Sequence, residues 1–203
     1  MIEIAAYDPA WPTRAQQLLK RITEALTGLP VPVQTVCDHI GSTAIPGLAA
    51  KPILDLQVRV AMLPSMDELA AALSPIGFVP AAGARPDSPG VYSDTPRPDS
   101  SASPEKYEKR LFHSPDEAAI LHIRRIDSPF AEFVVLFRDW LRPHPHHARQ
   151  YAERKFELAA QHAADLDYDD YTRAKTEIFD RIEPEMRRWA EQRDEPIESW
   201  RRL

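Results

Sequence analysis

The chain has 203 residues, of which 43% are hydrophobic and 28% charged, enough to form a buried core in one domain or two. Its formal net charge of -6 argues against general nucleic-acid binding, which normally requires a basic surface. Cys37 is the only cysteine, which excludes an intrachain disulfide. Neither a signal peptide nor an apolar run of roughly 18 residues is present, so we expect a cytoplasmic protein that does not contact membranes.

The first part of the chain alternates between helix and strand patterns. Residues 12–28 show helical spacing of leucine and isoleucine, and residues 31–40 are β-branched and end at Gly41, which predicts a helix and then a strand. Residues 53–60 alternate, with apolar side chains on one face and Asp55, Gln57 and Arg59 on the other. A second helix is expected over residues 65–73.

The second part begins with an irregular segment and becomes helical. Residues 80–104 are rich in proline, serine and glycine without periodicity, which indicates a long mobile loop. Residues 109–114 and 118–126 predict a β-hairpin, and residues 129–193 have helical patterns in three segments. We therefore expect an α/β (α+β) core over residues 1–128, with a helical region over residues 129–203 packed on it as one compact unit.

The polar residues of the 53–60 strand suggest a functional surface. If the neighbouring strands present matching faces, His39 and His122 join Asp55 and Gln57 on an open face of the sheet. Such a face is unfavourable to bury, so it is either solvated or functional. For both histidines, pairing with a neighbouring carboxylate inside the sheet is the structural alternative.

The turn after the first strand has features of a phosphate site. Glycine at position 41 permits close backbone approach, and exposed N–H groups together with the Ser42 hydroxyl can hold phosphate oxygens. Lys51 lies just before the next strand and supplies a positive charge for the same anion. The structural alternatives are that Ser42 caps the turn and that Lys51 is an ordinary exposed lysine.

A Gly-Ser turn followed by a strand aspartate resembles the nucleotidyltransferase superfamily, and a longer set of motifs resembles one of its branches, the GrpB family. These motifs are YDPAW at 7–11, HIGSTAIPGLAAKPILDLQV at 39–58, LHI at 121–123, FRDWLR at 137–142, and the pairs Tyr151/Lys155 and Tyr171/Lys175. The resemblance implies a nucleotidyltransferase-like mixed sheet with packed helices. It also implies that Gly41 and Ser42 hold a triphosphate and that strand carboxylates hold magnesium.

The chain departs from the superfamily pattern at one position. A second carboxylate is usual two residues after the first, and this chain has Gln57 there, a poor magnesium ligand. Either the metal is held by Asp55 together with His39, His122 or both, or catalysis has been lost. Among these residues, Asp55 and His122 are our predicted metal ligands.

The two Tyr/Lys pairs have i, i+4 spacing, which puts each pair on one helix face. We expect Tyr151, Lys155, Tyr171 and Lys175 to fold back over Gly41, Ser42 and Asp55, because an acidic protein that binds polyphosphate must gather its cations. A solvated stripe with aromatic packing is the alternative.

Three functions are compatible with these residues. The first is Mg²⁺- or Mn²⁺-dependent transfer of a nucleoside monophosphate from a nucleoside triphosphate to a small-molecule or protein acceptor, with Asp55, His39 and His122 as catalytic residues and Lys51, Lys155 and Lys175 neutralising charge. The second is a non-catalytic module that binds a nucleotide or phosphometabolite. The third, implied by the family resemblance alone, is an accessory domain linked to dephospho-CoA kinase.

Overall fold

The protein is described by a computed structural model that covers residues 3–29, 35–85, 87–88, 90–97, 100–165 and 169–192. Its strands are β1 (Val36–Ile40), β2 (Leu54–Val60), β3 (Val79–Pro80), β4 (Lys109–Ser114) and β5 (Ala119–Arg125). Its α-helices are α1 (Trp11–Leu26), α2 (Met66–Leu73), α3 (Pro129–Leu141), α4 (Pro145–Gln161) and α5 (Asp169–Glu191). Short 3-10 helices lie at Ser42–Ala44, Ser74–Ile76 and Pro104–Tyr107.

The five strands form one mixed sheet in the order β1-β2-β5-β4-β3. β2 and β5 are parallel, and the other three neighbouring pairs are antiparallel. β4 and β5 form the predicted hairpin. The mixed α/β fold expected from the sequence is therefore confirmed, and only the two-residue strand β3 was not predicted.

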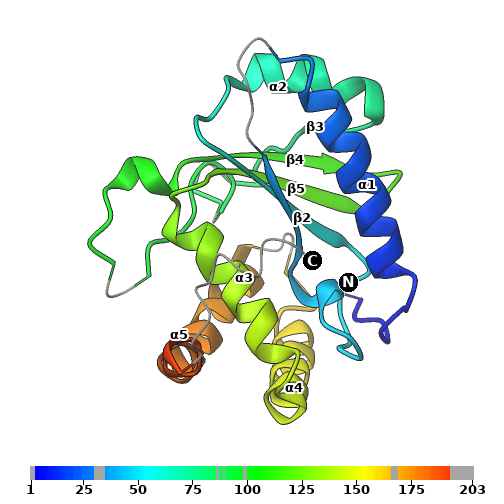
Figure 1. Ribbon diagram of the computed structural model, residues 1–203. Helices are drawn as coiled ribbons and strands as arrows, with labels where there is room; N and C mark the ends of the chain where they lie inside the picture. Colours follow the sequence, from blue (N-terminus) through cyan, green and yellow to red (C-terminus); the bar gives the residue numbers. More distant parts are fainter. Residues whose placement is uncertain are drawn as a thin grey trace.

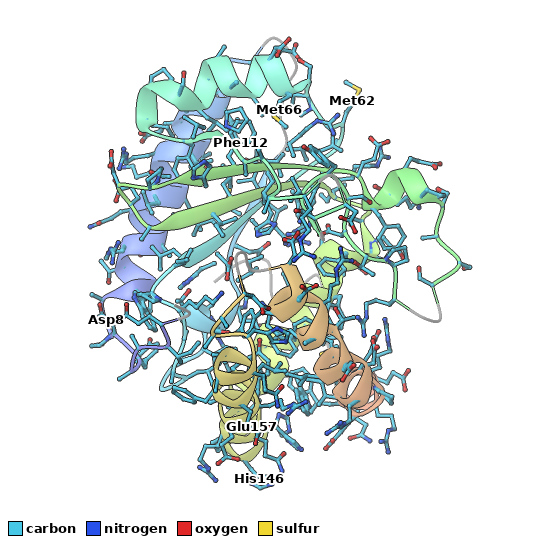
Figure 2. All side chains as sticks on the ribbon, turned by 180° about the vertical axis from the view of Figure 1, so that it is seen from behind. Asp8, Met62, Met66, Phe112, His146 and Glu157 are labelled. Carbon is cyan, nitrogen blue, oxygen red and sulfur yellow. The ribbon has the colours of Figure 1, made fainter. Side chains whose placement is uncertain are left out.

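One face of the sheet carries the main hydrophobic core. The apolar residues of β2 alternate inward and meet Trp11, Leu18 and Ile22 of α1, all of them buried. Phe112 of β4 lies in the same core, with Met66 of α2 packed against it, and Figure 2 shows both on the side of α1 and α2. Helix α2 begins at a capping box in which Ser65 and Glu68 bond each other's backbone N–H groups.

The polar face of the sheet is covered by α3, α4 and α5, which lie together below the strands in Figure 1. We expected this face to be open, and that expectation is wrong for part of β2, because Gln57 is 0% exposed and Arg59 only 3%. Arg138 of α3 fastens the helix to the sheet by donating to the His39 carbonyl at 2.9 Å, and Asp139 of the same helix holds its guanidinium in place. Burial of a polar face is tolerable when each polar group finds a partner.

Two predicted boundaries differ from the structure. The sequence RPHPHH at residues 142–147, with its two prolines, favours a loop joining two helices, but α4 begins at Pro145, whose fixed φ suits a first helical position. The first predicted strand was expected to start at residue 31, whereas β1 starts at Val36. Residues 31–34 lie outside the described part of the chain.

Between Pro80 and Pro104, the described residues form no helix or strand beyond a single bridge from Ser93 to Glu108. This segment is nevertheless fastened to α5. The Ser88 hydroxyl donates to Asp169 at 2.6 Å, and Arg97 bonds both Glu183 and Asp180. The mobility that we predict for the segment remains a prediction, and its contacts place it over the polar face of the sheet.

None of the helices in the described ranges combines the length and the apolar character needed to cross a membrane.

Candidate functional site

The polar face of the sheet is built by strand alternation and strand register. β2 presents Asp55, Gln57 and Arg59 to this face, and side chains of residues paired across neighbouring strands point to the same side. The register therefore adds Asp38 from β1, His122 and Arg124 from β5, and Lys109 from β4. The sheet thus brings Asp55 and His122 together, with 3.8 Å between Oδ1 and Nε2.

His39 does not join them, which corrects our expectation. It pairs with Leu56 in the register of β1 and β2, and so it lies on the opposite face from Asp55. Its Nε2 lies 2.9 Å from the Thr43 hydroxyl, and burial together with Arg138 and Arg142 lowers the pKa of His39 to about 4. His39 is neutral at physiological pH and stabilises the turn after β1, while Asp38 occupies the polar face instead.

Gly41 and Asp55 are in contact across the end of the sheet. Gly41 has φ +70°, in the left-handed region that favours glycine. A β-carbon added there would lie 2.3 Å from Asp55 Oδ2, closer than any real contact. The glycine therefore brings the Gly-Ser turn against the Asp55 carboxylate, which explains why the two belong to one motif.

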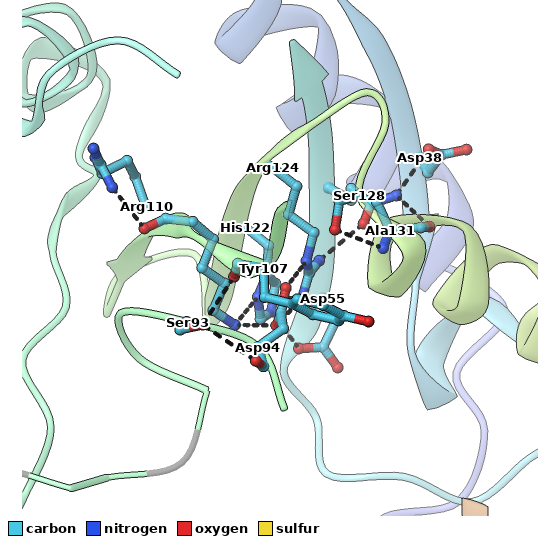
Figure 3. A network of polar contacts seen from close by, with 12 residues as sticks. Asp38, Asp55, Ser93, Asp94, Tyr107, Arg110, His122, Arg124, Ser128 and Ala131 are labelled. Carbon is cyan, nitrogen blue, oxygen red and sulfur yellow. Dashed lines mark hydrogen bonds and ion pairs between the residues drawn. The ribbon is translucent and has the colours of Figure 1, made fainter. Parts of the chain in front are cut away.

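A buried carboxylate from the 80–104 segment organises the cations on this face. Asp94 accepts hydrogen bonds from Arg124 and from Lys109, whose Nζ lies 2.8 Å away (Figure 3). Burial alone would raise the pKa of Asp94, but Arg124 and Lys109 hold it below its usual range. Both cations also face His122 Nδ1, at 3.1 Å and 3.2 Å.

These contacts fix the state of His122. Its Nδ1 lies between two donors and must accept, so the ring proton sits on Nε2, which faces Asp55. Burial and the charges of Lys109 and Arg124 keep the pKa of His122 well below its ordinary value, so the ring is neutral. A metal bound at Nε2 would displace that proton toward Nδ1, against Lys109 and Arg124, which argues against our prediction of His122 as a ligand.

Gln57 is held by partners that require an amide. Its Nε2 donates to Asp38 Oδ2 at 3.3 Å and to the Ala131 carbonyl at 3.2 Å, and its Oε1 accepts from Arg124 at 2.8 Å. A carboxylate at this position would have no N–H groups for the two acceptors. Glutamine at position 57 is therefore a structural residue that joins Asp38 and α3 to Arg124.

Lys51, Lys155 and Lys175, hereafter the lysine cluster, gather beside Asp55 as predicted for the folded-back helices. Lys155 Nζ donates to the Ser42 hydroxyl at 3.0 Å and to the Ala49 carbonyl at 2.7 Å. The Nζ atoms of Lys51 and Lys175 lie 4.3 and 4.9 Å from the centroid of the same ring, that of Tyr171. Burial and the charge of Lys175 lower the pKa of Lys51 to about 8 and that of Lys155 to about 7.

Tyr151 completes the turn side of the site. Its hydroxyl bonds Ser42, and its ring lies 4.7 Å from Lys155 Nζ. Burial raises the pKa of Tyr151, so the phenol stays protonated. The alternative of a solvated stripe does not describe the two Tyr/Lys pairs, since Tyr151, Lys155 and Tyr171 are buried.

A cavity of about 490 Å³ lies between the sheet, the 80–104 segment and helices α3 and α5. Its walls bring together most of the predicted residues with several that the sequence did not suggest. The lining includes Gly41, Ser42, Asp55, His122, Tyr151 and Lys175, together with Asp94, Lys109, Arg124 and Phe179. A cavity of this size holds a small organic molecule.

Comparison with known proteins identifies the family. The family model described as GrpB protein matches residues 1–185. This chain belongs to the GrpB family. Among curated GrpB relatives, a dephospho-CoA kinase of Mycolicibacterium paratuberculosis is 33% identical over 188 residues, covering 88% of this chain and 44% of that protein. A UPF0157 protein of Pseudomonas aeruginosa is 32% identical over 188 residues, covering 89% of this chain and 66% of that protein.

The chain spans less than two thirds of the length of these two relatives. Among solved structures, GrpB from Enterococcus faecalis aligns with a TM-score of 0.66 at 24% identity, covering 91% of this chain and 96% of that one. This likeness establishes that the GrpB fold is shared.

The residues present in this GrpB chain do not suit magnesium, which prefers octahedral coordination by oxygen. Within the described ranges, no group of three or more histidine, cysteine, aspartate or glutamate side chains is arranged to hold a metal ion. Asp55 faces the charges of Lys175, Arg124, Lys109 and Lys51, while Asp94 is engaged by Lys109 and Arg124. Cations occupy the surroundings of Asp55 where a metal site would need further oxygen ligands.

Proposed function

We propose that the cavity beside Gly41 and Ser42 binds a phosphorylated small molecule of the nucleotide class, without requiring a metal. The observation that carries this proposal is the lysine cluster, three partly desolvated ammonium groups gathered beside the carboxylate of Asp55. Like charges brought together in a low dielectric destabilise one another. A bound anion relieves that repulsion, and phosphate groups are favourable partners for lysine.

The polar residues around the cavity then have distinct roles in binding this ligand. Lys155 and Tyr151 hold the Ser42 hydroxyl at the edge of the cavity, where it can bond a phosphate oxygen. Lys175 lines the cavity and supplies a direct ionic contact. Asp94 keeps Lys109 and Arg124 aligned on the sheet face, so that they present a fixed positive field.

A second candidate is metal-dependent transfer of a nucleoside monophosphate from a nucleoside triphosphate. The close approach of Gly41 to Asp55 favours it, since this juxtaposition of a Gly-Ser turn with a strand carboxylate is the arrangement that the superfamily resemblance implies. In the part of the chain that the structure describes, Asp55 is surrounded by cations and no group of three metal-ligating side chains is found, which disfavours it. We therefore assign no catalytic step to the site.

A third candidate concerns coenzyme A metabolism. The Mycolicibacterium relative named dephospho-CoA kinase aligns with 88% of this chain. Dephospho-CoA contains an adenine nucleotide with a pyrophosphate, which places it in the ligand class that we propose. It therefore belongs among the compounds to be titrated.

Isothermal titration tests these candidates together. Nucleoside mono- and triphosphates and dephospho-CoA are titrated in EDTA and again with Mg²⁺ or Mn²⁺. Binding that persists in EDTA, and that weakens by about 1–3 kcal/mol in Lys175→Ala but not in the exposed control Lys20→Ala, supports the proposal. Binding that requires the metal supports nucleotidyl transfer instead. If none of the compounds binds in either condition, both proposals are wrong.

A further inference from the structure

The cavity has two chemically different walls. The sheet and the Gly41–Ser42 turn form a polar wall with Asp55, His122, Lys109 and Arg124. The opposite wall comes from α3 and α5 and consists of Phe130, Val134, Phe137 and Phe179. A phosphate group alone would contact only the polar wall, so the second wall fits a ligand that also has an apolar body.

The aromatic wall is held in a fixed arrangement. The Phe137 ring packs edge-on against Phe179, with centroids 5.0 Å apart, and against Tyr151 at 5.2 Å. The Arg124 guanidinium lies 5.3 Å from the centroid of the Phe130 ring, at the junction with the polar wall. Rigid aromatic faces of this kind bind planar rings by stacking, which is worth about 1–3 kcal/mol per nucleic-acid base.

The charge of the cavity limits the charge of the ligand. Lys109 and Arg124 share the carboxylate of Asp94, and Arg97 bonds two carboxylates of α5. Arg173, which also lines the cavity, is paired with Asp87. Lys175 faces Asp55, with the remaining lysines of the cluster behind it. The positive excess is therefore small, enough for a phosphate monoester dianion but not for the larger charge of a triphosphate without a metal.

We propose that the ligand is an organic monophosphate with a planar aromatic body, of the nucleoside monophosphate class. Its phosphate lies at Ser42 and Lys175, and its ring lies against Phe130 and Phe179. This inference rests on the proposed function and narrows it, because it specifies one phosphate and an aromatic ring.

The test compares four kinds of probe on the wild-type protein by isothermal titration in EDTA: the nucleoside monophosphates, ribose 5-phosphate, ATP and inorganic pyrophosphate. We expect at least one monophosphate to bind about tenfold or more tightly than ribose 5-phosphate, which lacks the base, and more tightly than ATP. Equal binding of ribose 5-phosphate and every monophosphate, or tighter binding of ATP, overturns the inference but leaves phosphate binding intact. No binding of any probe overturns the proposed function itself.

Two variants test where the aromatic ring of the ligand binds. Phe179→Leu removes an aromatic face from the cavity, and Phe156→Leu changes an exposed phenylalanine of α4 that does not line it. We expect Phe179→Leu to weaken monophosphate binding about tenfold while ribose 5-phosphate binding stays unchanged, and Phe156→Leu to change neither. Equal losses for both ligands would contradict the placement of the ring. If Phe179→Leu does not fold, the comparison of probes on the wild-type protein still decides the inference.

Discussion

Asp94 and Arg124 form a bidentate pair, with Arg124 Nε 2.6 Å from Oδ2 and Nη2 2.9 Å from Oδ1, and each side chain is only 2% exposed. Lys109 bonds the same carboxylate, so Asp94 is the anion that allows two cations to be buried on one sheet face.

Replacing this anion should strongly destabilise the fold. We expect Asp94→Asn to lower the free energy of unfolding by about 3–5 kcal/mol, since it removes the carboxylate that pairs directly with the buried Lys109 and Arg124. Urea denaturation measures the change. The control is Glu117→Gln, which breaks the more exposed pair with Arg21 and should lower stability by about 1 kcal/mol or less. An Asp94→Asn variant as stable as the control would show that Asp94 does not hold the cations in place.

Gly41 permits a matched test of its contact with Asp55. Both Gly41 and Gly47 have positive φ, +70° and +76°, so alanine is strained at either position. Among the described residues, no atom lies within 4 Å of a β-carbon added at Gly47, whereas at Gly41 it would collide with Asp55. We expect Gly41→Ala to destabilise the protein by about 2 kcal/mol more than Gly47→Ala in thermal or urea unfolding. Equal losses in the two variants would mean that the turn and the carboxylate do not touch.

Gln57→Glu introduces a carboxylate at the position where the nucleotidyltransferase superfamily, which the Gly-Ser motif resembles, usually has one. We expect it to lower stability by about 3 kcal/mol, because a buried charge would face Asp38 and the Ala131 carbonyl instead of donating to them. The exposed control Gln17→Glu on α1 should change stability by no more than about 0.5 kcal/mol.

Titration of the Gln57→Glu variant with Mg²⁺ should show no binding. Tight metal binding would show that glutamine alone had disabled a metal site.

Ligand affinity should depend on pH through the lysine cluster. In the free protein, the pKa of Lys155 is about 7 and that of Lys51 about 8, and a bound dianion raises both because it favours the charged form. Binding therefore takes up protons, and affinity falls as pH rises above 7. Below about pH 6 the phosphate itself loses its second charge. We expect the highest affinity between about pH 6 and 7, with a loss of about tenfold by pH 9.

Calorimetry checks this directly. At pH 8, the observed binding enthalpy should differ between two buffers of unlike ionisation enthalpy, in the direction of proton uptake. Lys155→Met should reduce the uptake and Lys20→Met should not. Affinity that stays constant from pH 6.5 to 9 would mean that the lysines do not meet the ligand's charge.

The sequence was sufficient to predict the fold. It was also sufficient to predict the part of the candidate site that β2 and the Tyr/Lys faces of α4 and α5 provide. The alternation of Leu54, Leu56 and Val58 predicts β2 and the outward face of Asp55, and the Tyr/Lys spacing predicts which faces of α4 and α5 meet the turn. These features are local, so they can be read from a few consecutive residues.

The remaining residues of the site could not be predicted, because their positions depend on contacts between segments that are far apart in the sequence. Whether Asp38 or His39 shares a face with Asp55 is set by the register of β1 on β2, and the VCDHI sequence has no apolar alternation that reveals it. Asp94 lies in a segment without periodicity, and nothing marks it among the other aspartates as the partner of Arg124, 30 positions away. The alternation of residues 118–126 does predict that Arg124 shares a face with His122. The roles of Arg124 and Lys109 could not be predicted, since they follow from the carboxylate of Asp94, which is brought near them only by folding.

Covalent labelling tests most directly whether the lysine cluster holds a phosphate group. Pyridoxal 5′-phosphate forms an imine with a neutral lysine amine, losing water, and borohydride reduces the imine to a stable amine that mass spectrometry can locate. We expect labelling at Lys51, Lys155 or Lys175 before the more exposed Lys20 and Lys106, protection by nucleoside monophosphates, and little labelling by pyridoxal, which lacks the phosphate. Labelling that follows exposure, with Lys20 first and no protection, would contradict the proposal that this cavity binds phosphate.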